Sequence, residues 1–336
     1  MDVRLSPEQR ALRDSAVQLV GNLGPRTVGA LDDEERSGKL DAAVDAAGWR
    51  ELRAPSEDAQ PWASAVEVAI VAEALAYGAA DCPFVGPTLA ADLRRRAGAP
   101  AAAAPETVGL SADLASIGDG SPTTLAIDAA RSTSALVVTA GRLAAVDLAP
   151  AEVRTDLTRP VATTATGATA TPVADAVIDA GALTAWTALG LAATCADLVG
   201  TMRGALELAA GYASDRNQYG RPVGSFQAVQ HLLADALVAT EGAASATLHA
   251  AWAVDALAPE DAVAAGAIAK AWCSRAARLV CETAIQVHGG IGNTWECFAH
   301  VHLRRALLSI DVLGGVGPNL DRVLAHHGIG ASDGLR

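Results

Sequence analysis

Two polar loops in the last third of the chain contain the residues best suited to bind an anionic ligand. In the first loop, RNQYGRPVGSFQ, Arg216 offers a planar guanidinium group that suits phosphate, and Gln218 adds a side-chain amide. Glycine and proline residues then favour tight turns that let a ligand approach the backbone. Phe226 and Gln227 open a long helical pattern, whose N-terminus favours an anion. The loop is therefore predicted to bind phosphate. The alternative is a helix–helix turn in which Arg216 pairs with a neighbouring carboxylate.

The second loop, QVHGGIGNTWE, runs from Gln286 to Glu296. Its glycines could end a helix, or they could let a ligand lie close to the backbone. An HGG string also resembles an esterase oxyanion loop, but the GxSxG string lies in residues 330–334, with no strand before it and no helix after it. The sequence contains no Walker A or HExxH motif, and its GxG strings do not follow a strand. Hydrolase, P-loop and Rossmann chemistry are not expected.

The elements that position these loops are predicted from two changes in residue composition and hydrophobic pattern along the chain. Residues 1–105 have helical patterns, 106–180 are rich in threonine and valine with frequent turns, and 181–336 contain long helical runs. We therefore predict a mostly α fold with a small central antiparallel β domain, flanked by an N-terminal helical domain and a C-terminal four-helix bundle. Both loops fall between long helices, where bundles build ligand sites. Residues 328–336 read as a frayed tail.

Composition narrows the possible partners. The net charge of −13 argues against nucleic-acid and anionic-membrane partners. The five cysteines have irregular spacing, which predicts buried free thiols in a reducing compartment and no metal site. The first residues are charged, and no uncharged apolar run reaches the ~20 residues of a membrane span. We expect a cytoplasmic protein.

Together the two loops resemble the C-terminal bundle of the acyl-CoA dehydrogenase family. There the first loop reads R-x-x-F/Y-G-x-x-(I/L/V)-x-x-F/H-Q and the second reads Q-x-x-G-G-x-G; the close resemblance covers roughly residues 182–313. It implies that these segments reach across a subunit interface to an FAD held mainly by a neighbouring subunit. The resemblance assigns Arg216 and Gln218 to the pyrophosphate region of FAD. It assigns Phe226 and Gln227 to the lining of the same channel. The adenosine end is assigned to Gln286, Gly289 and Gly290.

The sequence departs from the family at the catalytic base. The family's reaction is an α,β-desaturation, in which a carboxylate removes the α-proton of an acyl-CoA while hydride leaves to the flavin. By matching position, the two places where the family keeps this carboxylate are Leu313 and Gly190, and neither residue can accept a proton. Asp197 and Asp311 are candidate substitutes. We expect each to be a surface or capping carboxylate, because a base must be placed to within ~0.5 Å.

The sheet region also departs from the family. Residues 106–180 contain no tryptophan, and Gly118–Ser121 is a poor match to the family's flavin-ring loop. The combination resembles the short, base-lacking subunit of bacterial heterotetrameric enzymes of sterol side-chain breakdown. It implies a second, full-length family subunit as partner, an acyl-CoA substrate, and an electron-transfer flavoprotein or similar acceptor. Two alternatives stay open: a self-sufficient homomeric enzyme with a relocated base, and a flavin-free scaffold on the same fold.

Overall fold

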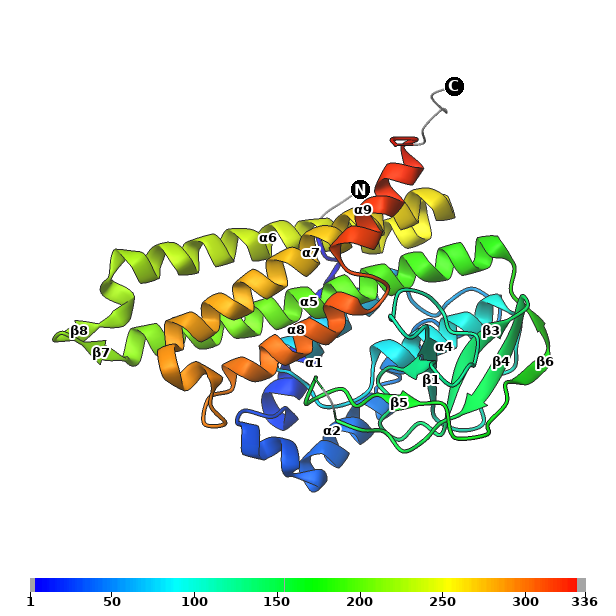
Figure 1. Cartoon of the computed structure of the whole chain (residues 1–336), viewed down its shortest axis with the longest axis horizontal. Helices are drawn as coiled ribbons and strands as arrows, with labels where there is room; N and C mark the ends of the chain where they lie inside the picture. The colour runs from blue at the N-terminus through cyan, green and yellow to red at the C-terminus, as the bar shows by residue number, and fades with distance from the viewer. Residues whose placement is uncertain (1–3, 154, 331–336) are drawn as a thin grey trace.

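The computed structural model describes residues 4–153 and 155–330, and it confirms a mostly helical protein with a small sheet (Figure 1). Four helices precede the sheet strands, and the long helices follow them. The α-helices are α1 (Pro7–Leu23), α2 (Glu34–Ala46), α3 (Ala65–Tyr77), α4 (Val85–Arg96), α5 (Ala180–Asp215), α6 (Gln227–Ala256), α7 (Pro259–His288), α8 (Ala299–Asp311) and α9 (Val316–His326). Short 3₁₀ helices are η1 (Val28–Asp32), η2 (Trp49–Glu51), η3 (Val223–Ser225) and η4 (Gly289–Asn293).

Local sequence signals explain where α1 begins. Ser6 is the N-cap and accepts a hydrogen bond from the backbone N–H of Gln9, while the Gln9 side chain accepts one from the Ser6 backbone. Two orphan N–H groups of the helix start are thereby satisfied. Pro7 occupies the first turn, where its missing N–H costs nothing.

The sheet is mixed, so the expectation of a purely antiparallel sheet was wrong. Its order is β5-β2-β1-β3-β4-β6, and β1 pairs with β3 in parallel, with Glu106 opposite Ser134. The connection through residues 111–133 is long enough for a crossover between parallel strands, and it places β2 on the other side of β1. The strands are β1 (Glu106–Leu110), β2 (Leu125–Ala126), β3 (Ser134–Thr139), β4 (Arg142–Asp147), β5 (Ala162–Thr163) and β6 (Thr171–Val177).

The C-terminal bundle is built around α5, which packs against α3, α6, α7 and α8. Small residues let the helices approach closely. A Cβ on Gly200 would lie 2.1 Å from the carbonyl oxygen of Glu73, and one on Gly204 would lie 2.2 Å from that of Tyr77. By length and composition α5 could cross a membrane, but 72% of its most apolar stretch is buried inside the protein. All five cysteines are free and buried, as expected.

Candidate functional site

The first polar loop is a two-residue β-hairpin at the end of the bundle, far from the sheet (Figure 1). Strand β7 (Asn217–Gln218) pairs with β8 (Arg221–Pro222), and the connecting residues Tyr219 and Gly220 have φ of 52° and 79°. Positive φ at both central residues is the signature of a type I′ turn, which matches the natural twist of paired strands. The hairpin therefore has a defined shape and projects its side chains from the bundle.

The polar side chains proposed to bind the ligand face solvent. Arg216, Gln218 and Gln227 are all exposed. Within residues 4–153 and 155–330, Arg216 forms no ion pair, so the alternative of a simple turn with a paired arginine is not observed. The N-terminus of α6 is equally open, because its N-cap residue, Phe226, makes no side-chain capping bond. Unsatisfied N–H groups at a helix start favour an anion.

The second loop lies at the same end of the bundle. His288, the last residue of α7, stacks on Tyr212 near the end of α5, with ring centroids 4.5 Å apart. Gly289 has φ of 66° and follows the helix directly. A Cβ on Gly289 or Gly290 would meet nothing within 4 Å, so both residues face open space. Gln286 is also exposed. The two loops thus present an open, polar end of the bundle.

These groups are chemically suited to contact a dinucleotide. A guanidinium group, amides, an uncapped helix start and open glycines suit the pyrophosphate and adenosine of FAD. Two further residues here were not predicted from the sequence. Tyr219 is 93% exposed at the hairpin tip, and the guanidinium carbon of Arg221 lies 4.2 Å from the centroid of the Phe226 ring. Tyr219 lies inside the first loop's motif, whereas no sequence signal indicated that Arg221 contacts Phe226.

The two positions where a base was sought lie against each other. Gly190 is in α5, and Leu313 follows the end of α8. A Cβ built on Gly190 would lie 2.3 Å from Cδ1 of Leu313 and 3.6 Å from Cδ1 of Leu89. Leu313 is only 1% exposed. An apolar side chain therefore fills the point at which both alternative carboxylates would converge.

The backbone turn at Leu313 is held from several sides. Leu313 has φ of 59°, an unfavourable region for a side chain of this size, and its N–H donates to the carbonyl of Leu114 at 2.7 Å. Arg322 donates to the Leu313 carbonyl at 2.6 Å. Asn319 donates to the Gly314 carbonyl at 2.7 Å. These contacts offset the strain of the turn.

Lys270 of α7 also stabilises this turn. Its ammonium group is fully buried and donates to the carbonyls of Ser309, Ile310 and Gly314 at 2.9, 2.7 and 3.1 Å. A cation at the C-terminal carbonyls of α8 complements the helix dipole. Burial nevertheless lowers the pKa of Lys270 to about 8. The turn is thus a closed, internally satisfied structure.

Asp197 belongs to a buried ion-pair network. The expectation of a surface or capping carboxylate was wrong for this residue, which is 0% exposed. Arg305 lies 2.6 Å from its Oδ1, while Arg159 lies 3.3 Å and Ser309 2.6 Å from its Oδ2. Burial alone would raise the pKa of Asp197, but the two arginines outweigh it and hold the pKa below its ordinary value. Asp311, by contrast, is exposed at the end of α8.

The network joins all three parts of the chain. Arg159 also pairs with Asp128, at 2.5 Å, and Asp128 accepts a hydrogen bond from the N–H of Gly86 at the start of α4. Arg305 donates further to the carbonyl of Ala80, at 2.9 Å. Because Asp128 and Asp197 are both paired, the network is suited to holding elements together and poorly suited to moving a substrate proton.

Comparison with known proteins identifies the bundle. Residues 180–316 match the model of the acyl-CoA dehydrogenase C-terminal domain. This part of the chain is a domain of the acyl-CoA dehydrogenase C-terminal type. The chain is 44% identical over 137 residues to acyl-CoA dehydrogenase FadE34 of Mycobacterium tuberculosis, covering 40% of this chain but 19% of that protein. It is 35% identical over 171 residues to acyl-CoA dehydrogenase IpdE2 of Mycolicibacterium smegmatis, covering 51% of this chain and 50% of that protein. The match thus spans half or less of each relative's length.

Solved structures extend the likeness of fold to nearly the whole chain. A variant of the Tcur3481-Tcur3483 steroid ACAD superposes with a TM-score of 0.79 at 22% identity, over 96% of this chain and 98% of that one. The ChsE4-ChsE5 complex from Mycobacterium tuberculosis gives 0.79 at 22% identity, over 98% and 99%. The N-terminal helices and the sheet therefore complete an acyl-CoA dehydrogenase fold.

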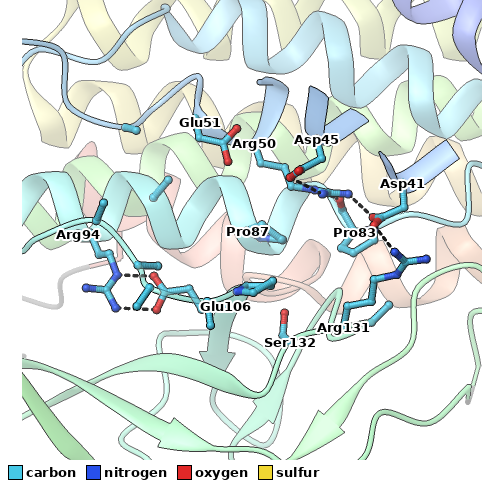
Figure 2. Close-up of a pocket in the computed structure, with 18 of the residues that line it drawn as sticks. Asp41, Asp45, Arg50, Glu51, Pro83, Pro87, Arg94, Glu106, Arg131 and Ser132 are labelled. Atoms are coloured by element: carbon cyan, nitrogen blue, oxygen red, sulfur yellow. Dashed lines mark hydrogen bonds and ion pairs between the residues drawn. The ribbon is translucent and has the colours of Figure 1, made fainter. Parts of the chain in front are cut away.

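A cavity of about 520 Å³ lies elsewhere in this acyl-CoA dehydrogenase fold, between α2, α4 and the segment leading into β1 (Figure 2). Its arginines are already neutralised. Arg50 pairs with Asp41, Arg131 lies 2.8 Å from Asp41, and Arg94 donates to Glu106 at 2.7 Å. Prolines and alanines make up much of the remaining wall. The cavity has no arginine free for a phosphate group and lies away from both polar loops.

Proposed function

We propose that this chain is the FAD-sharing, non-catalytic subunit of a heteromeric acyl-CoA dehydrogenase that desaturates an acyl-CoA thioester between its α and β carbons. One observation carries the proposal: Leu313 packs directly against Gly190, and by the resemblance these are the two positions where the family keeps its base. Without a positioned base, α-proton removal loses on the order of 10²–10⁴ in rate. The open end of the bundle, with its exposed arginine and amide groups, supports a binding role for the chain.

In this proposal the chain supplies half of the cofactor site. Arg216 and Gln218 would hold the pyrophosphate of FAD, with Phe226 and Gln227 lining the same channel. Gln286 and the backbone at Gly289–Gly290 would receive the adenosine end. When bound, FAD supplies the acceptor for the hydride that leaves the β carbon. The proton would be taken by a carboxylate of the partner subunit.

The partner is a second, full-length acyl-CoA dehydrogenase-type subunit. An apolar stripe on the bundle supports such an interface: Ile268, Trp272 and Leu279 of α7 are each about half exposed, and Val238 of α6 is 73% exposed. Trp272 donates to the carbonyl of Ala239, so the stripe continues from α7 onto α6. Exposed apolar surface of this kind marks protein interfaces. The likeness in fold to the ChsE4-ChsE5 complex and to the Tcur3481-Tcur3483 steroid ACAD agrees with a heteromer.

Substrate, acceptor and location follow as further parts of the proposal. A CoA thioester carrying a steroid side chain is the favoured substrate, supported by the likeness in fold to the Tcur3481-Tcur3483 steroid ACAD. Electrons would pass to an electron-transfer flavoprotein or a similar acceptor, and the complex would act in the cytoplasm. The proposed domains are an N-terminal helical domain (residues 1–105), a small β domain (106–180) and a C-terminal helical bundle (181–336).

Purification with and without a partner tests this function. The chain is expressed alone and together with a full-length acyl-CoA dehydrogenase-family subunit, and flavin content, sedimentation and acyl-CoA desaturation with an artificial acceptor are measured. We expect a colourless, inactive protein alone, and a yellow, active complex with one FAD per pair. A yellow, active protein alone would establish the homomeric alternative. A protein that stays colourless in every combination would be a scaffold.

A further inference from the structure

Arg221 is an exposed cation that lies among the proposed cofactor contacts without belonging to the family motif. It is on β8 of the hairpin, directly opposite Gln218 in the strand pairing. Residues opposite each other in an antiparallel pair share one face, with Cβ atoms roughly 4.5–5.5 Å apart. The guanidinium carbon lies 4.2 Å from the centroid of the Phe226 ring. Arg221 thus lies between two residues assigned to the FAD channel.

The contact with Phe226 gives this arginine a defined position. A guanidinium group over an aromatic face gains roughly 0.5–1 kcal/mol at an exposed site and loses rotamer freedom. Tyr219 contacts the same ring edge to face, at 6.3 Å between centroids. Phe226 in turn is the N-cap of α6, and its N–H donates to the carbonyl of Val223 at 3.2 Å. The side chain of Arg221 is therefore held beside the open start of α6 before any ligand arrives.

A second cation would complete the charge balance of the proposed site. The pyrophosphate of a dinucleotide carries two negative charges, and Arg216 balances one of them. Among the residues that the structure describes, Arg221 forms no ion pair with a carboxylate, so its N–H donors remain available. Arginine donors and helix N-terminal N–H groups are together well suited to bind phosphate oxygens.

We propose that Arg221, stacked on Phe226, is a second contact to the FAD pyrophosphate. This inference rests on the proposed function, since it needs FAD at the open end of the bundle. The arrangement gives each phosphate its own guanidinium group, one from the end of α5 and one from β8. The stacked position also makes the second contact depend on Phe226, which thereby acts as a platform for Arg221.

The test measures FAD affinity of the heteromeric complex, not its turnover. Apo complex is titrated with FAD, and flavin absorbance and fluorescence give the Kd for the wild type, Arg221→Ala, Arg221→Lys and Phe226→Leu. Removing a charge-assisted hydrogen bond predicts a Kd about 10-fold to 100-fold higher for Arg221→Ala. Arg221→Lys and Phe226→Leu are expected to lie between it and the wild type. The salt dependence of Kd becomes shallower in Arg221→Ala, because one ionic contact is lost.

Two controls separate the possible failures. Arg13→Ala removes an exposed charge from α1 and should leave Kd unchanged, while Arg216→Ala reports on the proposed function itself. An unchanged Kd in Arg221→Ala, beside a raised Kd in Arg216→Ala, overturns the inference and leaves the function standing. Absence of FAD binding in the wild-type complex overturns the function. Dissociation of the Arg221→Ala complex at saturating FAD, seen by sedimentation, would assign Arg221 to the partner protein and also overturn the inference.

Discussion

Two regions of the C-terminal bundle differ in how their polar groups are placed. At the hairpin end, Arg216 and Gln218 are exposed, and the start of α6 has no side-chain cap. At the turn after α8, Lys270 and Asn319 are buried and donate to carbonyls of the same chain. An exposed polar group stays free to contact an external ligand, whereas a buried and fully hydrogen-bonded group stabilises the fold. The contrast indicates that the hairpin end is open to a ligand and that the turn after α8 is closed.

The largest effect is expected from Asp197→Ala. Removing one partner of a buried ion pair leaves Arg305 and Arg159 uncompensated, so the free energy of unfolding should fall by about 3–5 kcal/mol. Denaturant unfolding followed by circular dichroism measures the loss. Asp311→Asn is the matched control, because Asp311 is exposed, and it should change stability by less than about 0.5 kcal/mol. Equal, small effects of both changes would refute a stabilising role for the network.

Lys270 gives the closed turn a characteristic pH dependence. Its pKa falls from the ordinary value of 10.5 to about 8 in the folded chain, mainly because of burial. Between these values the unfolded chain binds more protons than the folded one, so this lysine makes stability rise with pH, by at most about 1.4 kcal/mol per pH unit. Below pH 8 the contribution is constant.

The buried thiols oppose that trend, because burial raises the pKa of Cys82 and Cys281 to about 12. The useful measurement is therefore the difference in unfolding free energy between the wild type and Lys270→Met from pH 8 to 10.5. That difference should change in favour of the wild type as the pH rises. A constant difference would mean that the pKa of Lys270 is the same in both states.

At the open end, Arg216→Ala should separate binding from folding. Loss of a hydrogen bond to a charged group predicts an FAD affinity weaker by about 1.5–3 kcal/mol in the complex. Without FAD, stability should change by no more than about 0.5 kcal/mol, since the side chain is exposed. Flavin titration and thermal unfolding measure the two quantities. A large stability loss without FAD would show that Arg216 has a structural role like that of Lys270.

The contact between Gly190 and Leu313 predicts a smaller, non-additive effect. Gly190→Ala places a Cβ within 2.3 Å of the leucine side chain, and overpacking of this kind typically costs about 1–3 kcal/mol. Leu313→Ala in the same chain should relieve the clash, so the double variant should be more stable than the sum of the single changes predicts. Strict additivity in a double-mutant cycle would contradict direct packing.

Local signals in the sequence were enough for much of the fold. The helical pattern before residue 106 and the long helical runs after residue 180 depend on neighbouring residues, and both were predicted. The parallel pairing of Glu106 with Ser134 depends on how the long connection between β1 and β3 folds back. The residues next to each strand in the sequence do not determine that path. Helix α9 was not predicted as a separate helix. Residues 331–336 of the predicted frayed tail lie outside the described residues.

In the candidate site, too, features set by neighbouring residues were predicted, and features that depend on distant contacts were not. The motifs place Arg216, Gln286 and their neighbours at one end of the bundle, but their roles toward FAD stay predictions. Asp197 was misjudged, because its partners Arg159 and Arg305 are distant in the sequence and a lone aspartate in an apolar run gives no sign of them. The contact between Arg221 and Phe226 depends on a hairpin that only the three-dimensional structure shows.

The buried network also bears on the order of events during synthesis. Arg159 pairs with Asp128 and Asp197, but Arg305, which shares Asp197 with it, is made much later. At ~5–20 residues per second, a ribosome needs about 7–30 s to travel from residue 159 to residue 305. During that interval the sheet region and the first helices lack the α8 groups that complete their common core. The nascent chain therefore holds an incomplete ion-pair network until the last part of the bundle emerges.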